Sequence, residues 1–99
     1  MKIKILESAI QDLLQGHRFY EQQEKGLGGY FIDSLFSDID SLQIYAGIHS
    51  VHFNKYRLLA KRFPFAVYYT VNDNIVLVHA VLDCRQDPFN TINRLQLLI

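Results

Sequence analysis

The chain has 99 residues, of which 49% are hydrophobic and 20% charged, a composition too apolar for a disordered protein. Its ten basic and ten acidic residues cancel, which disfavours a protein that holds nucleic acid by charge alone. No apolar run approaches the roughly 20 residues of a membrane-spanning helix, and the single cysteine, Cys84, cannot form an internal disulfide. We therefore expect one domain over residues 1–99, without a signal peptide or membrane contact, in the reducing cytoplasm.

The N-terminal part predicts a strand followed by a helix. Lys2–Leu6 alternates apolar and basic residues, which is typical of a strand with one wet face. Ser8 and Gln11 have the spacing of a capping box, in which each side chain satisfies a free amide at a helix start. Apolar residues then recur at helical spacing, so the helix is expected to run to about Lys25.

A second helix is expected after a very short connection. Residues 26–29 include three glycines, which favour the left-handed backbone that ends helices. Apolar residues then recur at helical spacing from about Gly28 to Ala46, and Gly47 ends the segment. Two helices joined so closely predict an antiparallel helical hairpin.

The second half of the chain predicts a sheet. The hydrophobic period changes to two from Ile48, which indicates a strand over about 51–61, before a junction or tight turn at Pro64. Residues 65–71 are rich in aromatic and β-branched side chains and predict a second strand. Ile75–Leu82 is apolar enough for a central strand that is covered on both faces.

Short polar segments separate these elements and introduce a last helix. Asn72-Asp73-Asn74 has turn chemistry, and Asp87 followed by Pro88 is typical of an N-cap and the first residue of a helix. The expected buried stripe of this short C-terminal helix is Phe89, Ile92, Leu95 and Ile99. The order β-α-α-β-β-β-α predicts an α+β domain, with helices packed on one face of a small, twisted, mainly antiparallel sheet.

The zero net charge conceals an uneven distribution along the chain. Residues 1–47 hold four basic and seven acidic residues, a net charge of −3. Residues 48–99 hold six basic and three acidic residues, a net charge of +3. If the two halves fold into different layers, one face of the protein becomes mildly basic. The alternative is ordinary surface charge without functional meaning.

No residue cluster predicts a metal or cofactor site. His49 and His52 are three apart in an expected strand, so they point to opposite faces, and no Cys or His pair has zinc-finger spacing. His79 lies inside an apolar strand, where a hydrogen-bonded core or interface imidazole is favoured over a catalytic one. Cys84 is followed by Arg85 but has no evident partner base, so we interpret it as a small apolar residue.

The main candidates for function are four basic residues on or just after expected strands: Arg57, Lys61, Arg62 and Arg85. By the period of two, Arg57 and Lys61 share one face of a strand, and Arg85 follows the central strand. Cations gathered there would hold a phosphate, stabilise charge on a phosphodiester during cleavage, or receive acidic groups of a protein partner. The alternative is a solvated sheet face.

A family resemblance is carried by Tyr56–Tyr69, by Val81–Pro88, and by the two ends of the first expected helix, Ala9–Leu13 and Phe19–Gly28. These segments resemble the RelE/ParE superfamily of type II toxin–antitoxin toxins, most specifically in Phe63-Pro64-Phe65 and in the residues that follow Leu82. The resemblance covers essentially the whole chain. It implies a helical hairpin on a small twisted sheet, and a cognate antitoxin that wraps the toxin in a hetero-oligomer.

The superfamily divides into two functions. RelE-like members are metal-free nucleases that cut mRNA on the ribosome, whereas ParE-like members poison DNA gyrase. Arg85 falls where RelE-like enzymes carry a key arginine, and Arg57 and Lys61 fall near their basic strand. Two departures disfavour a nuclease, because Ala66 replaces a further arginine and no Tyr or His follows His79. Losing one such donor typically costs about 100-fold in rate.

We therefore favour a ParE-like toxin that inhibits its target, such as DNA gyrase, by binding it without a cofactor. The expected contact residues for the target or partner are Arg57, Lys61, Arg62, Arg85 and Phe89. The second hypothesis is a ribosome-dependent mRNA endonuclease, in which Arg85 stabilises the cleaving phosphate while Lys61 or Arg62 assists. The third is an attenuated member that only binds its antitoxin. Whether the protein is an enzyme stays open.

Overall fold

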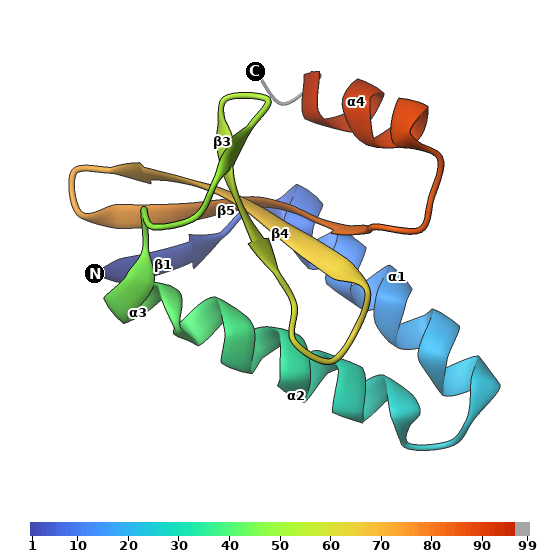
Figure 1. The fold of residues 1–99 in the computed structure, drawn as a ribbon. Coiled ribbons are helices and arrows are strands. Elements are labelled where there is room, and N and C mark those ends of the chain that lie inside the picture. Colours follow the sequence, from blue (N-terminus) through green and yellow to red (C-terminus); the bar gives the residue numbers. More distant parts are fainter. Residues whose placement is uncertain (97–99) are drawn as a thin grey trace.

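The computed structural model describes residues 1–96 and contains one five-stranded sheet with helices on both faces (Figure 1). The elements are β1 (Lys2–Ile5), α1 (Glu7–Gln23), α2 (Leu27–Asp40), α3 (Leu42–Tyr45), β2 (Val51–His52), β3 (Lys55–Leu59), β4 (Phe65–Asn72), β5 (Ile75–Asp83) and α4 (Pro88–Gln96). The strands are ordered β1-β5-β4-β3-β2 across the sheet. Only the β1–β5 pair is parallel, so the expected α+β class and mainly antiparallel sheet are confirmed.

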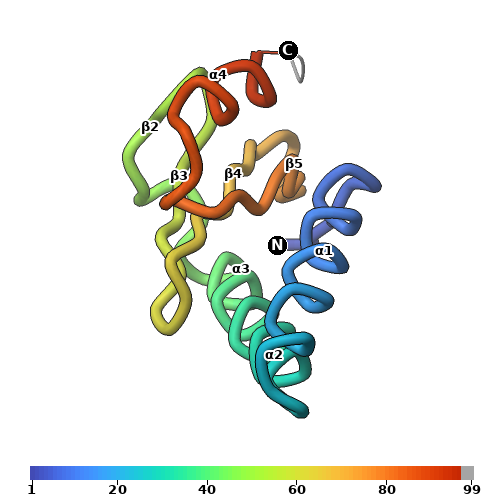
Figure 2. The backbone as a smooth tube through the Cα atoms, turned by 90° about the vertical axis from the view of Figure 1, so that its right-hand side faces the viewer, coloured from blue at the N-terminus to red at the C-terminus, as the bar shows by residue number. Residues whose placement is uncertain are grey.

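The expectation that all helices cover one face of the sheet is wrong. Helices α1 and α2 pack on one face, over a core that includes Phe31, Leu35 and Val67. Helix α4 covers the opposite face, where the fully buried Leu95 packs with Tyr68 and its neighbours. Figure 2 shows the sheet between the α1–α2 pair and α4. Both faces of β5 are therefore covered, as its apolar sequence predicted.

The expected strand over 51–61 is a hairpin of two strands, β2 and β3. The chain reverses at Phe53 and Asn54, which both have positive φ angles of 56° and 62°. A phenylalanine rarely adopts this backbone, so the turn has no strong signal in the sequence. The turn between β4 and β5 has the same geometry at Asp73 and Asn74, where the sequence does have turn chemistry. That expected turn is confirmed.

The expected capping box at the start of α1 is wrong. The Ser8 hydroxyl donates to the carbonyl of His79 at 2.8 Å, and the Gln11 amide donates to the Glu7 carboxylate at 2.9 Å. The residue before the helix, Leu6, still belongs to the sheet ladder, since its N–H donates to the Val78 carbonyl at 3.0 Å. The N-cap position is therefore taken by Leu6, which has no polar side chain, and the Ser8 hydroxyl connects α1 to β5 instead.

The helical hairpin forms as expected, although α1 ends at Gln23. Gly26 has a φ of +88°, which requires glycine. At Gly28 a Cβ would lie 2.7 Å from the backbone carbonyl of His17, so glycine also permits the close approach of α2 to α1. The Glu21 carboxylate accepts the N–H groups of Gly26 and Gly28, and these bonds hold its pKa below the usual value.

The second expected helix is interrupted near its end. Helix α2 ends at Asp40 and the short α3 begins at Leu42. The hydroxyl of Ser41 donates to the Asp38 carbonyl at 2.6 Å, which offers that carbonyl a partner other than the helix backbone. A local side-chain hydrogen bond of this kind is not visible in the hydrophobic period.

Helix α4 begins as expected, because the Asp87 carboxylate accepts the N–H of Phe89 at 2.9 Å. Its expected stripe is correct at Leu95, which is fully buried, but wrong at Phe89, whose exposed fraction is 65%. Ile99 lies outside the described residues. Within residues 1–96, no helix is both long enough and apolar enough to cross a membrane.

Candidate functional site

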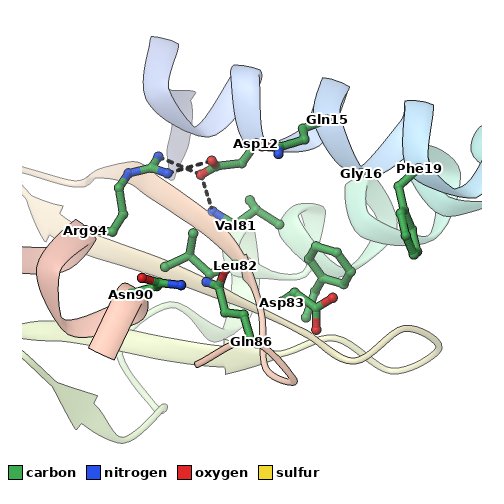
Figure 3. Close-up of a pocket in the computed structure, with 11 residues that line it drawn as sticks. Asp12, Gln15, Gly16, Phe19, Val81, Leu82, Asp83, Gln86, Asn90 and Arg94 are labelled. Atoms are coloured by element: carbon green, nitrogen blue, oxygen red, sulfur yellow. Dashed lines mark hydrogen bonds and ion pairs between the residues drawn. The ribbon is translucent and has the colours of Figure 1, made fainter. Parts of the chain in front are cut away.

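Two cavities flank the connection between β5 and α4. The first, here called the Asp12 cavity, has a volume of about 360 Å³ and lies between α1, β5 and α4 (Figure 3). The second, the Arg57 cavity, has a volume of about 340 Å³ and lies between the β2–β3 hairpin, β5 and α4. Leu82, Asp83 and Gln86 line both cavities. The end of β5 therefore forms their shared wall.

The Asp12 cavity is bordered by a fully satisfied ion pair. Both Asp12 carboxylate oxygens accept from the Arg94 guanidinium at 2.8 Å, and one of them also accepts the Val81 N–H at 3.0 Å (Figure 3). Arg94 donates further to the Ser8 carbonyl at 3.2 Å. The pair thereby joins α1, β5 and α4. Because every member has partners inside the protein, we interpret this cluster as structural.

Arg85 is likewise bound within the protein. Its Nε and Nη2 donate to the two carboxylate oxygens of Asp83 at 3.0 and 2.8 Å, and Nη2 also donates to the Tyr20 hydroxyl at 3.2 Å. The bond to Arg85 holds the pKa of Asp83 below its usual value. The Nε–Nη2 edge of the guanidinium, one of the edges that can bind a phosphate or carboxylate, is therefore occupied by this chain's own Asp83.

Arg57 differs from both of these arginines. It lies opposite Tyr68 on the face of the sheet that α4 covers. Its Nε is buried and has no hydrogen-bond partner. Among residues 1–96, the ion pairs are Arg94–Asp12 and Arg85–Asp83, so no carboxylate neutralises Arg57. Arg57 lines the Arg57 cavity, and the one carboxylate among the lining residues, Asp83, is paired with Arg85.

Neighbouring groups in the Arg57 cavity stay protonated at neutral pH. Burial raises the pKa of the Tyr68 phenol, an effect that the nearby Arg57 only partly offsets. Burial also raises the pKa of the Cys84 thiol, so Cys84 is not a reactive thiolate. The remaining walls include the apolar side chains of Phe53, Leu82, Pro88 and Ile92. The cavity thus offers hydrogen-bond donors and one positive charge on an apolar surface.

The other sequence-predicted residues lie elsewhere. Strand β3 ends at Leu59, so the expectation that Arg57 and Lys61 share one strand is wrong. Lys61 and Arg62 lie in the turn before β4, where the N–H of Lys61 donates to the Asp38 carboxylate at 3.1 Å. This turn is tied to the end of β5, since the Cys84 N–H donates to the Pro64 carbonyl at 2.8 Å. Lys61, Arg62 and Arg85 therefore lie at one end of the sheet, apart from Arg57.

Two histidines, His79 and His49, have partners within the protein. His79 lies at a bulge of β5, and its Nε2 is 2.8 Å from the Thr70 hydroxyl, which fits a hydrogen-bonded interior imidazole. His49 precedes β2 and bonds through Nδ1 to the Tyr69 hydroxyl, and burial lowers its pKa. Within residues 1–96, no group of three His, Cys, Asp or Glu side chains is placed to hold a metal ion.

Sequence reasoning missed Asp12, Arg94 and Tyr68. Asp12 had a usable signal, because it stands among the buried positions of α1, which include Ala9 and Leu13. An acid in such a stripe needs a buried partner. Arg94 is 82 positions away in the sequence, and nothing in the spacing identifies it as that partner. Tyr68 was read only as part of an aromatic strand.

Comparison with known proteins supports the fold. No protein-family model and no curated protein matches the sequence. Among solved structures, a chain of the chromosomal ParDE toxin–antitoxin system from P. aeruginosa is similar, with a TM-score of 0.74 and 19% sequence identity. The similarity covers 82% of this chain and 92% of that chain. At this identity it establishes a shared fold: the chain folds like a chain of that ParDE system, which is consistent with the resemblance expected from the sequence.

Proposed function

We propose that this protein is the toxin of a type II toxin–antitoxin module, that it inhibits its target by binding, and that a cognate antitoxin neutralises it. The observation that supports the proposal is the fold shared with a component of the ParDE system. Together with the residue pattern over Tyr56–Tyr69 and Val81–Pro88, this likeness favours a toxin over an unrelated α+β domain. The proposed protein acts in the cytoplasm as a single domain over residues 1–99.

The proposed target is DNA gyrase, and the proposed mode of action is binding. The arrangement of Arg85 supports binding over RNA cleavage, because Asp83 and Tyr20 already occupy its guanidinium. A metal-free nuclease needs free cations where negative charge develops on the phosphate. The proposed contact residues for target or antitoxin are Arg57, Lys61, Arg62, Arg85 and Phe89.

A supercoiling assay with purified protein and purified gyrase tests this proposal. We expect inhibition at micromolar protein, and weaker inhibition by the double variant Lys61→Gln and Arg62→Gln. The matched control is Arg18→Gln, which removes one positive charge from the exposed surface of α1. Unchanged supercoiling at every concentration, with protein of native circular dichroism, would rule out gyrase as the target.

The nuclease hypothesis retains one supporting observation, the position of Lys61, Arg62 and Arg85 at one end of the sheet. Primer extension on translated mRNA tests it. Codon-positioned cuts that disappear in Arg85→Ala would favour the nuclease over the binding toxin, and intact message would exclude it. Expression without an antitoxin tests the third hypothesis, because normal growth would identify an attenuated binding module.

A further inference from the structure

We propose that the Arg57 cavity receives a carboxylate side chain from an acidic, amphipathic segment of the antitoxin. The inference rests on the proposed function, which supplies the partner. It adds the site at which a negative charge of that partner binds. The cavity lies between the β2–β3 hairpin and α4, which are neighbours at the top of Figure 2.

The first argument is the unbalanced charge of Arg57. The Nε–H group of Arg57 is buried, so it loses hydration and gains no hydrogen bond in return. Arg94 and Arg85 show how this chain treats its other partly covered arginines, since each bonds to an internal carboxylate through two nitrogens. Asp83 lines the same cavity but is paired with Arg85, so the carboxylate that pairs with Arg57 in this proposal comes from a bound partner.

The second argument is the set of donors and walls around Arg57. The phenol of Tyr68 stays protonated because burial raises its pKa, so it adds a hydroxyl donor next to the guanidinium. Apolar walls surround these donors. Phe53 on the wall is 41% exposed, and Phe89, next to Pro88 at the start of α4, is 65% exposed. Apolar side chains of a partner can cover this rim while one carboxylate enters the cavity.

The same features disfavour a nucleic-acid backbone. Of the residues that line the cavity, only Arg57 carries a permanent positive charge, and Asp83 adds a carboxylate to the wall. Affinity for a phosphate backbone grows with the number of cations that contact successive phosphates. One guanidinium among apolar side chains therefore fits a single carboxylate on an amphipathic peptide better than a chain of phosphates.

The resonance of the Arg57 Nε–H group in ¹⁵N–¹H spectra reports directly on this site. The probes are a short, acetylated and amidated amphipathic peptide of leucine and glutamate, the same peptide with glutamine in place of glutamate, and a short single-stranded uridine RNA. We expect the glutamate peptide to shift the Arg57 resonance and to bind about tenfold to a hundredfold more tightly than the glutamine peptide.

Two variants connect this preference to the residue. Arg57→Gln removes the charge and should abolish the preference for glutamate, whereas Arg18→Gln, the exposed control, should retain it. If Arg57→Gln does not fold, the Nε–H resonance of the unmodified protein still decides. Equal binding of the glutamate and glutamine peptides, or binding of RNA with a larger Arg57 shift than either peptide gives, would overturn the proposal.

These results are separable from the toxin proposal. A glutamate-dependent shift in a protein that neither inhibits gyrase nor slows growth would support the carboxylate site and reject the toxic activity. If the protein is toxic but the glutamate peptide does not shift the Arg57 resonance, the toxin proposal stands and the carboxylate site is rejected.

Discussion

Arg94, on α4, and Arg57, on β3, differ in how the fold provides hydrogen-bond partners for them. Arg94 donates to both oxygens of Asp12 and to the Ser8 carbonyl, which joins the first and last helices. Arg57 lies in a cavity of similar size and has a buried Nε without a hydrogen-bond partner, while the Asp83 carboxylate on the cavity wall is paired with Arg85. The charge of Arg94 is neutralised by Asp12 within the protein, as expected for an arginine with a structural role. The contrast therefore separates a structural arginine from one that is available to a partner.

The largest effect on stability is expected at the Asp12–Arg94 ion pair. Asp12→Ala leaves Arg94 without its counter-ion and the Val81 N–H without its acceptor. Breaking a buried ion pair in this way should lower the free energy of unfolding by about 3 kcal/mol. Urea denaturation followed by circular dichroism measures the loss. The control is Asp33→Ala, on the exposed face of α2, which should change stability by less than about 0.5 kcal/mol. Equal stability of the two variants would contradict a structural role for the pair.

The second prediction compares the same substitution at the two arginines. Arg94→Met should destabilise the protein, because it leaves the Asp12 carboxylate buried without its ion-pair partner. Arg57→Met should instead raise the free energy of unfolding by about 1 kcal/mol, because a methionine fills the space without an unpaired buried charge. Thermal and urea unfolding measure both variants. Destabilisation of similar size at both positions would show that Arg57 also has an internal structural partner.

Local patterns in the sequence predicted the elements that depend on local chemistry. Asp73 and Asn74 form the expected turn because their short polar side chains tolerate positive φ. Asp87 caps α4 because its carboxylate reaches an N–H two residues later. The β2–β3 hairpin was missed, since Phe53 at its turn has no turn chemistry and the period of two continues through the reversal.

The site was harder to predict, because it depends on contacts between distant residues. The sequence singled out four basic residues as a group, but the structure places Arg57 apart from the other three, and the partners of each depend on tertiary neighbours. Arg85 is occupied by a residue two positions before it and by Tyr20, 65 positions away. Arg57 has no ion pair among residues 1–96, because the Asp83 carboxylate in its cavity is paired with Arg85. Residue spacing along the chain does not predict such contacts between residues far apart in the sequence.

The third prediction concerns pH and two histidines whose pKa burial lowers, His49 and His79. Burial lowers the pKa of His49 and His79, so the unfolded chain binds more protons than the folded one below about pH 6.5. Stability is therefore fully present above that pH and falls as the pH drops through the lower, folded-state pKa values. We expect stability to decrease between pH 7 and pH 5. Substituting both histidines with glutamine should flatten this dependence in urea titrations, and an unchanged slope would contradict the assignment.

The smallest effect is expected at Asp83. It tests whether the ion pair with Asp83 prevents Arg85 from binding external anions. Asp83→Asn removes the ion pair with Arg85, whose side chain is 55% exposed, so unfolding should become easier by less than about 1 kcal/mol. The released guanidinium should now bind anions, and ³¹P spectra of inorganic phosphate should show stronger broadening with the variant than with the unmodified protein. The double variant Asp83→Asn with Arg85→Gln is the control and should lose this gain. If phosphate binding is unchanged in Asp83→Asn, then Asp83 does not prevent Arg85 from binding anions. The comparison with Arg57 would then be limited to the arginine of the Asp12–Arg94 pair.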